Sequence, residues 1–134
     1  MSQQSIRDDE HCFCCGANND KGLHLKYSYP EPGAAETSLV IPAYFSGWEE
    51  ITHGGLISML LDETMAHACK SRELQGVTGE LTVRFKTPLP VGTKVKVYGT
   101  AEEPRGRLTK TEAVVSDEAG TVYATGSAKF IVTK

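Results

Sequence analysis

The sequence predicts a single α+β domain in which an antiparallel sheet curls around one long helix. Residues 53–72 contain no proline, and their only glycines, Gly54 and Gly55, stand at the start. This segment is apolar nearly all round a helical wheel, which indicates a buried helix rather than a surface one. Several other segments alternate apolar and polar side chains, as half-buried strands do. One buried helix among many strands is best covered by a sheet that wraps around it.

The expected element order is β-β-α-β-β-β-β. The strands are expected at residues 23–29, 37–41, 81–85, 95–97, 108–116 and 122–132. The first two should pair with each other across a turn at residues 30–33, and residues 42–50 show no regular pattern. We expect residues 1–10, which are polar and acidic, to form a flexible tail, and residues 11–134 to form the single domain.

The composition excludes several classes of protein. The chain of 134 residues has a formal net charge of −3, so it lacks the basic excess of a nucleic-acid-binding domain. Its first ten residues contain no apolar run of the kind found in signal peptides. Asp62 and Glu63 interrupt the longest apolar stretch before it is long enough to span a bilayer. We therefore expect a cytoplasmic protein with no nucleic-acid partner and no membrane partner.

The start of the predicted helix has the features of an anion site. Gly54 and Gly55 open the helix directly after His53. The first backbone N–H groups of a helix lack intrahelical acceptors and lie at the positive end of the helix dipole. Without a Cβ to shield them, the N–H of Gly55, and with it that of Gly54, could stabilise the oxyanion that forms when a carbonyl is attacked.

Two adjacent acids lie in the middle of the predicted helix. A carboxylate such as Asp62 is costly on an apolar helix unless it has partners or a function. Partial burial would raise its pKa toward the range of a general base. The alternative is a structural carboxylate satisfied by hydroxyl groups. Glu63 points about 100° away from Asp62 on the wheel, and it is either a substrate contact or a structurally paired acid.

These residues resemble the thioesterase superfamily of hot-dog proteins, in particular its phenylacetyl-CoA and acyl-CoA thioesterase branch. His53-Gly54-Gly55 is followed by Asp62 nine positions after the histidine, as in that family. The similarity continues in the strand after the helix, at Val77, Thr78, Leu81, Val83, Phe85 and Pro88. Residues 12–23, Cys-Phe-Cys-Cys-Gly-Ala-Asn-Asn-Asp-Lys-Gly-Leu, resemble the lead-in of the family. The resemblance covers residues 12–134 and implies the hot-dog fold.

The resemblance also implies a reaction and roles in it. The chain would hydrolyse an acyl-CoA thioester to a carboxylic acid and CoA, with Asp62 acting either as general base or as nucleophile. Gly55 would stabilise the oxyanion, and Thr78 would orient the water. His53 would brace the turn that presents the glycines, or would simply pack there. Some members carry Asn or Gln six residues before the histidine, whereas this chain has Gly47.

The family implies no metal and no cofactor apart from the CoA of the substrate. It also implies a homodimer with active sites shared between subunits, and dimers that pair further. On this basis Asp62 and Thr78 of one site are expected to come from different protomers.

Basic residues are needed near the site to bind the phosphates of CoA. The candidates for substrate binding are Arg84 and Lys86 after the helix, and Arg105 and Arg107 in a glycine-containing hairpin, with Lys110 close by. The alternative for each one is an ordinary solvated surface charge.

Three cysteines, Cys12, Cys14 and Cys15, gather near the start of the chain. In a chain without an export signal we expect thiols rather than disulfides. A zinc site usually has two spaced pairs of ligands, and the sequence shows no second pair. A redox Cys-x-x-Cys would need a βαβ context, which is missing. We therefore expect a packing loop that binds no metal.

Two other functions are compatible with the sequence. One is a hot-dog dehydratase or hydratase of acyl thioesters, which would need a loop histidine as proton acceptor. The other is a non-catalytic acyl-CoA-binding module, in which Asp62 is only structural.

Overall fold

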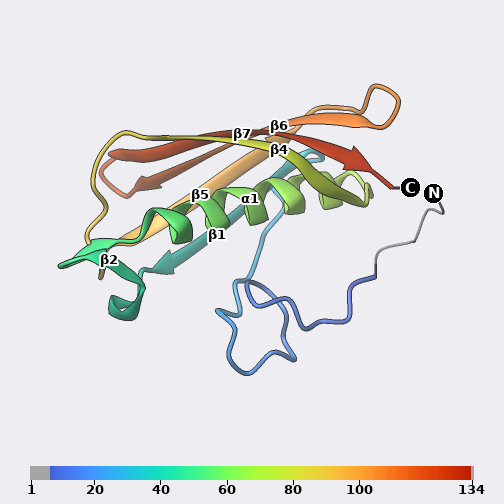
Figure 1. The fold of residues 1–134 in the computed structure, drawn as a ribbon. Helices are drawn as coiled ribbons and strands as arrows, with labels where there is room; N and C mark the ends of the chain where they lie inside the picture. The colour runs from blue at the N-terminus through green and yellow to red at the C-terminus, as the bar shows by residue number, and fades with distance from the viewer. Residues whose placement is uncertain (1–6, 134) are drawn as a thin grey trace.

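A five-stranded antiparallel sheet curves around a single long helix in the computed structural model, which describes residues 7–133 (Figure 1). The helix is α1, Gly54–Ser71, and a short 3-10 turn, η1, spans Ala43–Phe45. The strands are β1 (Ala34–Val40), β2 (Ser46–Trp48), β3 (Ile51–Thr52), β4 (Gly76–Phe85), β5 (Lys94–Ala101), β6 (Leu108–Asp117) and β7 (Val122–Val132). The predicted α+β hot-dog architecture is confirmed.

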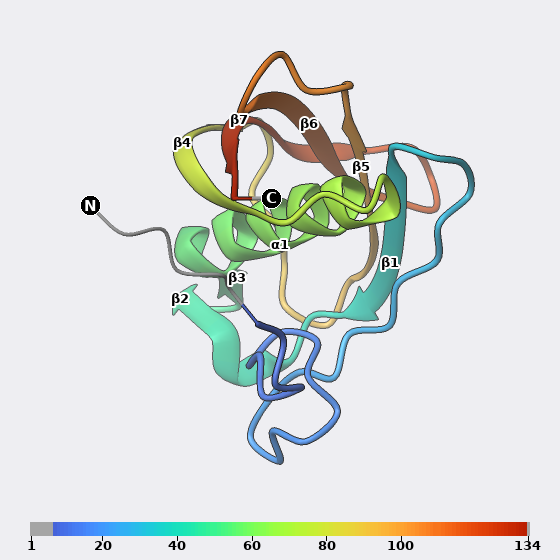
Figure 2. The same cartoon turned by 90° about the vertical axis from the view of Figure 1, so that its right-hand side faces the viewer.

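The strands of the large sheet follow the order β1-β5-β6-β7-β4, so β1 and β4 form its two edges. Alternating side chains of each strand face the helix, for example Val97 of β5, Val115 of β6 and Phe130 of β7, all of them buried. In Figure 2, β4, β7 and β6 lie above the helix and β5 and β1 lie to its right, so the sheet curls over the helix and down one side. The four segments predicted as strands after the helix match β4 to β7, and β4 begins five residues earlier than predicted.

The core forms where α1 lies against the sheet. Leu60, Leu61 and Met65 are fully buried and project toward it. Gly126 of β7 lies opposite Leu61 and Met65, and an added Cβ there would lie 3.3 Å from Cδ1 of Leu61. The absence of a side chain at Gly126 therefore lets the helix pack close to the sheet.

The predicted pairing of residues 23–29 with residues 37–41 is wrong. Residues 23–29 form no strand, and only Ser28 makes an isolated bridge, to Glu36. The N–H groups of Leu23 and Leu25 instead donate to the carbonyl groups of Phe13 and Cys14. The backbone of this segment is therefore hydrogen-bonded to the cysteine loop, and β1 pairs with β5. The alternating pattern of this segment nevertheless predicted burial correctly at Leu25.

The N-terminal segment covers the side of α1 that the sheet leaves open. Both views place it across the helix from β6 and β7 (Figures 1 and 2). Residues 1–6 of the expected tail lie outside the described residues. In the remainder of that tail the Asp8 carboxylate lies 3.3 Å from Nζ of Lys70 on α1. Residues 42–50, expected to be irregular, contain η1 and β2, and β2 pairs with β3 just after them in a small hairpin.

No helix within residues 7–133 has the length and apolarity needed to cross a membrane.

Leu61→Ala should lower the free energy of unfolding by about 2–5 kcal/mol, because it leaves a cavity between α1 and β7. Val40→Ala on the exposed side of β1 is the matched control and should change it by less than about 0.5 kcal/mol. Chemical denaturation of both variants measures the two values. Similar small losses in both would contradict this assignment of the core.

Candidate active site

The first turn of α1 is organised by His53. This residue is the N-cap of the helix, and its Nδ1 accepts a hydrogen bond of 2.8 Å from the Gly55 N–H. Its carbonyl oxygen accepts the Leu56 N–H at 3.0 Å. Because Nδ1 acts as an acceptor, it carries no proton, and the ring holds the turn in place. The arrangement corresponds to the bracing role considered for His53.

The N–H of Gly55 is therefore occupied, contrary to the expectation that it would be the main oxyanion donor. Within residues 7–133, no acceptor lies at the N–H of Gly54. This group is the first donor of the helix and lies at the positive end of its dipole. Of the two glycines, Gly54 is the one with a donor available to a ligand.

A hollow of about 390 Å³ lies beside Gly54. It is lined by Trp48, Ile51, Thr52, Gly54, Ile57, Phe85, Lys86, Thr87, Pro88 and Leu89. Trp48 is 82% exposed and Phe85 is 56% exposed, so two large aromatic side chains face solvent around the helix N-terminus. Sequence reasoning did not assign a role to either aromatic residue.

Asp62 and Thr78 form a close pair. The Thr78 hydroxyl donates to Oδ1 of Asp62 at 2.6 Å, joining the middle of α1 to the start of β4. The register of β4 against β7 shifts between Thr78 and Glu80, which is the mark of a bulge. The two side chains thus already meet within one chain, whereas the sequence led us to expect them from different protomers.

The free glycine donor and the carboxylate are far apart within one chain. Gly54 and Asp62 are eight residues apart on α1, which corresponds to about 12 Å along the helix axis. One carbonyl group cannot contact the N–H of Gly54 and a water held by Asp62 of the same helix.

Glu63 has a different environment from Asp62. Its Oε2 lies 3.3 Å from Nε2 of His67, one turn further along α1, and accepts from Sγ of Cys12 at 3.5 Å. Burial by itself raises the pKa of the Glu63 carboxyl, but hydrogen bonds from His67 and Cys15 outweigh it and the pKa is lowered. Glu63 thus lies against the cysteine loop instead of beside Thr78.

All four cysteines are thiols, as expected. Burial and the Glu63 carboxylate raise the pKa of the Cys14 and Cys15 thiols, so neither has the thiolate character of a nucleophile. Sequence reasoning did not predict that His67 would lie beside Glu63 and the cysteine loop. The spacing of Glu63 and His67, which places both on one face of the helix, was the available signal.

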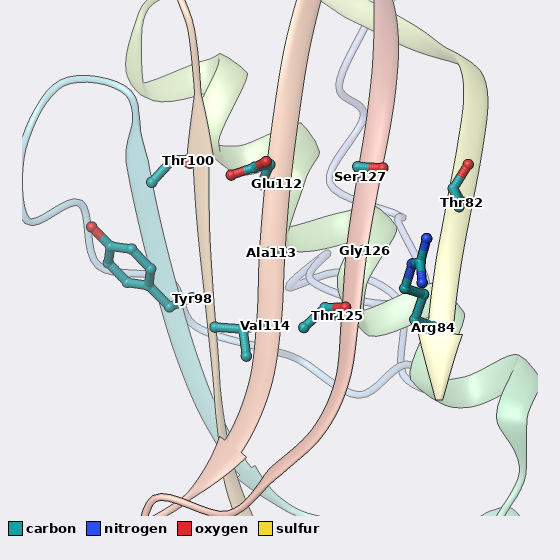
Figure 3. A pocket seen from close by; sticks show the side chains of 10 residues that line it. All are labelled: Thr82, Arg84, Tyr98, Thr100, Glu112, Ala113, Val114, Thr125, Gly126 and Ser127. Atoms are coloured by element: carbon teal, nitrogen blue, oxygen red, sulfur yellow. The ribbon is translucent and has the colours of Figure 1, made fainter. Parts of the chain in front are cut away.

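The basic candidates do not gather in one place. Lys86 lines the hollow beside Gly54. Arg84 lines a separate hollow of about 500 Å³ on the face of the sheet that points away from α1 (Figure 3). Arg105 and Arg107 lie in the β5–β6 connection, at the opposite end of the sheet from β2 (Figure 1). Only Lys86 is therefore placed beside the helix N-terminus.

Gly47 lies against His53. A Cβ on Gly47 would be 3.0 Å from Cα of His53 and 3.1 Å from Cδ2 of its ring. This close approach leaves little room for the Asn or Gln side chain that some thioesterases have at this position.

Comparison with known proteins identifies a family. The family described as the thioesterase superfamily matches residues 49–124, which is more than half of the chain. No curated protein matches the sequence. Among solved structures, a thioesterase superfamily protein has a TM-score of 0.84 at 20% identity, with 91% of this chain and 63% of that chain covered. The chain thus spans less than two thirds of the length of that relative.

Two further structures share the fold over most of their length. The PaaI protein from the phenylacetic acid degradation operon of Escherichia coli has a TM-score of 0.76 and 19% identity, with 82% of this chain and 80% of that chain covered. A hypothetical thioesterase of Streptococcus pneumoniae, solved with coenzyme A, has a TM-score of 0.74 and 14% identity, with coverages of 81% and 89%. It was also solved with alanine replacing an aspartate, and with alanine replacing a threonine sixteen positions later.

His53→Ala should lower the free energy of unfolding by about 1 kcal/mol, because the Gly55 N–H loses its acceptor. His53→Asn should retain most of the stability, since an asparagine side chain can accept the same N–H. Thermal and chemical unfolding of the two variants test this difference. Equal losses would show that the ring stabilises the turn by packing and not by accepting the hydrogen bond.

Proposed function

Because the chain belongs to the thioesterase superfamily, we propose that it hydrolyses an acyl-CoA thioester to a carboxylic acid and CoA. The observation that carries the proposal is the hydrogen-bonded pair of Asp62 and Thr78 at the surface between α1 and β4. These residues are sixteen positions apart, the same spacing as the aspartate and threonine replaced in the Streptococcus pneumoniae protein. The structure of that protein with coenzyme A supports CoA as part of the substrate.

In this proposal Asp62 supplies the reactive oxygen. Thr78 donates to Oδ1, which leaves Oδ2 available to take a proton from a water molecule as it attacks the thioester carbonyl. Collapse of the tetrahedral intermediate breaks the carbon–sulfur bond, and the sulfur of CoA leaves as a thiol after it receives a proton. Direct attack by Asp62, which would give an anhydride that water then hydrolyses, fits the same geometry.

The oxyanion donor in this proposal is the N–H of Gly54. It has no acceptor within the described residues and lies at the positive end of α1. Since about 12 Å of helix separates Gly54 from Asp62, the donor for one site must come from a second chain. The shared active site is therefore divided between Gly54 of one protomer and the Asp62–Thr78 pair of the other.

The β4 edge is the surface through which we propose that two chains join. It is a ten-residue edge strand of the sheet. Val77, Leu81 and Phe85 on this strand are all exposed large apolar side chains. A long apolar edge of this kind is usually covered or paired. Pairing of two β4 strands would form one continuous sheet with two equivalent sites.

Lys86 is the proposed contact for a CoA phosphate, because it lines the hollow that contains Gly54. The dehydratase alternative receives less support, since Nδ1 of His53 already accepts the Gly55 N–H. A non-catalytic acyl-CoA-binding module remains the second candidate, and a hydrolysis assay separates it from an enzyme.

Hydrolysis of a panel of acyl-CoA substrates, followed through the free thiol of CoA, tests the reaction. Asp62→Asn keeps the size of the side chain but removes its basicity, so kcat/KM should fall by at least about 10²-fold. Thr78→Ala should lower it by about 10-fold, through loss of a hydrogen bond to a charged group, while Thr78→Ser should retain it. Glu118→Gln, in the exposed β6–β7 turn, is the charge-matched control. Wild-type protein that binds CoA but hydrolyses no substrate would instead indicate a binding module.

The division of the site is tested at Gly54. Proline is tolerated at the first position of a helix and has no N–H, and the extended backbone of His53, with ψ 133°, suits a following proline. Gly54→Pro should therefore lower kcat by about 10²–10³-fold, whereas Gly54→Ala keeps the N–H and should be nearly as active as wild type.

Mixing chains with different damaging substitutions then shows which groups come from different protomers. Random refolding of Gly54→Pro with Asp62→Asn should restore about a quarter of wild-type activity, because half of the dimers are mixed and one of their two sites is intact. Asp62→Asn mixed with Thr78→Ala, which keeps about a tenth of the activity, should give no more than the average of the two variants alone, because both groups come from one chain. Restoration by the second mixture and not by the first would contradict the proposed division.

A further inference from the structure

The cysteine loop and α1 bring four metal-binding side chains together on the side of the helix away from the sheet. Sγ of Cys12 lies 3.5 Å from Oε2 of Glu63, and Nε2 of His67 lies 3.3 Å from the same oxygen. Ligand atoms of Cys15, Glu63 and His67 all lie within 4.8 Å of one another. Ligand atoms of Cys12, Cys14 and Glu63 form a second such group, so the Glu63 carboxylate is common to both.

Two of these separations match those of a tetrahedral zinc site. With bonds of about 2.3 Å to sulfur and about 2.0 Å to nitrogen and oxygen, neighbouring sulfur and oxygen ligands are about 3.5 Å apart, and nitrogen and oxygen ligands about 3.3 Å apart. The Cys12–Glu63 and His67–Glu63 distances have these values.

The spacing of the ligands is also that of a zinc site. Cys12 and Cys15 form a Cys-x-x-Cys pair on a loop, and Glu63 and His67 form an i, i+4 pair on one face of a helix. The expectation of a metal-free loop rested on the lack of a second pair in the sequence. The fold provides that pair from a segment about fifty residues away.

Two tyrosines hold the histidine in the orientation that such a site requires. The Tyr29 hydroxyl lies 2.8 Å from Nδ1 of His67. The Tyr27 ring stacks on the imidazole, with ring centroids 3.9 Å apart and an interplanar angle of 9°. Metal-binding histidines commonly use the second ring nitrogen for a hydrogen bond of this kind, which fixes the ring and aims the other nitrogen at the metal.

We propose that Cys12, Cys15, Glu63 and His67 bind one zinc ion, which ties the N-terminal loop to α1. Thiolate and imidazole ligands favour zinc over magnesium or calcium. Four protein ligands close the coordination sphere, so the ion is structural and takes no part in hydrolysis. Binding releases the thiol protons of Cys12 and Cys15 to solvent. Cys14 also lies near Cys12 and Glu63, but its side chain is 2% exposed and packs in the hydrophobic core, so the proposal leaves it as a packing thiol.

Elemental analysis of the full chain, purified without chelator from zinc-supplemented cells, should give about one zinc per chain. Cys12→Ser, Cys15→Ser and His67→Gln should each lower this content at least about 5-fold by removing a ligand. Cys69→Ala and His24→Gln remove a thiol and an imidazole outside the cluster, and both should keep the metal. Removal of zinc from the wild-type chain should lower its Tm.

Reduced, metal-free wild-type protein provides a test that needs no variant. Reconstitution with Co²⁺ should give the charge-transfer absorption of cobalt–thiolate bonds and the visible bands of tetrahedral cobalt. Wild-type protein that takes up neither zinc nor cobalt overturns the proposal, as does a Cys12–Cys15 disulfide in freshly isolated protein. Zinc retained equally by the Cys12→Ser and His67→Gln variants overturns it as well.

Discussion

The burial of α1 is the constraint on which the rest of the structure depends. A helix that is apolar nearly all round needs cover on several sides, and the transfer of its apolar surface out of water is the main driving force available to a chain of this size. The sheet covers one side with residues such as Val115 and Phe130. The N-terminal segment covers another, where Cys14 and Leu25 are buried in the same core. The two acidic side chains of the helix, Asp62 and Glu63, lie in the gaps between these covers.

Both sites of the molecule lie in those gaps. Asp62 faces β4 and meets Thr78, while its neighbour Glu63 faces the cysteine loop and meets His67. A rotation of about 100° between successive helical residues is enough to send two adjacent acids to different surroundings. One acid is held by a single hydroxyl at an accessible surface. The other is surrounded by thiols and an imidazole, and it belongs to the support of the helix.

The proposed active site and the proposed zinc site would share the helix α1 but no reacting group. An ion that fixes the cysteine loop to Glu63 and His67 would also hold the middle of α1, where Asp62 is placed. Strand β4 contacts the same stretch of α1 from the other side, because its Thr78 is hydrogen-bonded to Asp62. Assembly through β4 would thus position the carboxylate in one chain and bring the Gly54 donor from the next.

The sequence by itself determined the helix and the four strands that follow it, and it singled out Gly54, Asp62 and Thr78 as candidates, because periodicity and motif spacing are local properties. It did not determine the partner of residues 23–29, because a strand pattern reports burial but not the segment that takes its hydrogen bonds. In the structure, the carbonyl groups of Phe13 and Cys14 accept those hydrogen bonds. It also could not show that His53 occupies the Gly55 N–H, that Thr78 meets Asp62 within one chain, or that Cys12 meets Glu63. The first is set by a side-chain rotamer, and the other two join segments far apart in the sequence, so only the packing of the helix against its covers decided them.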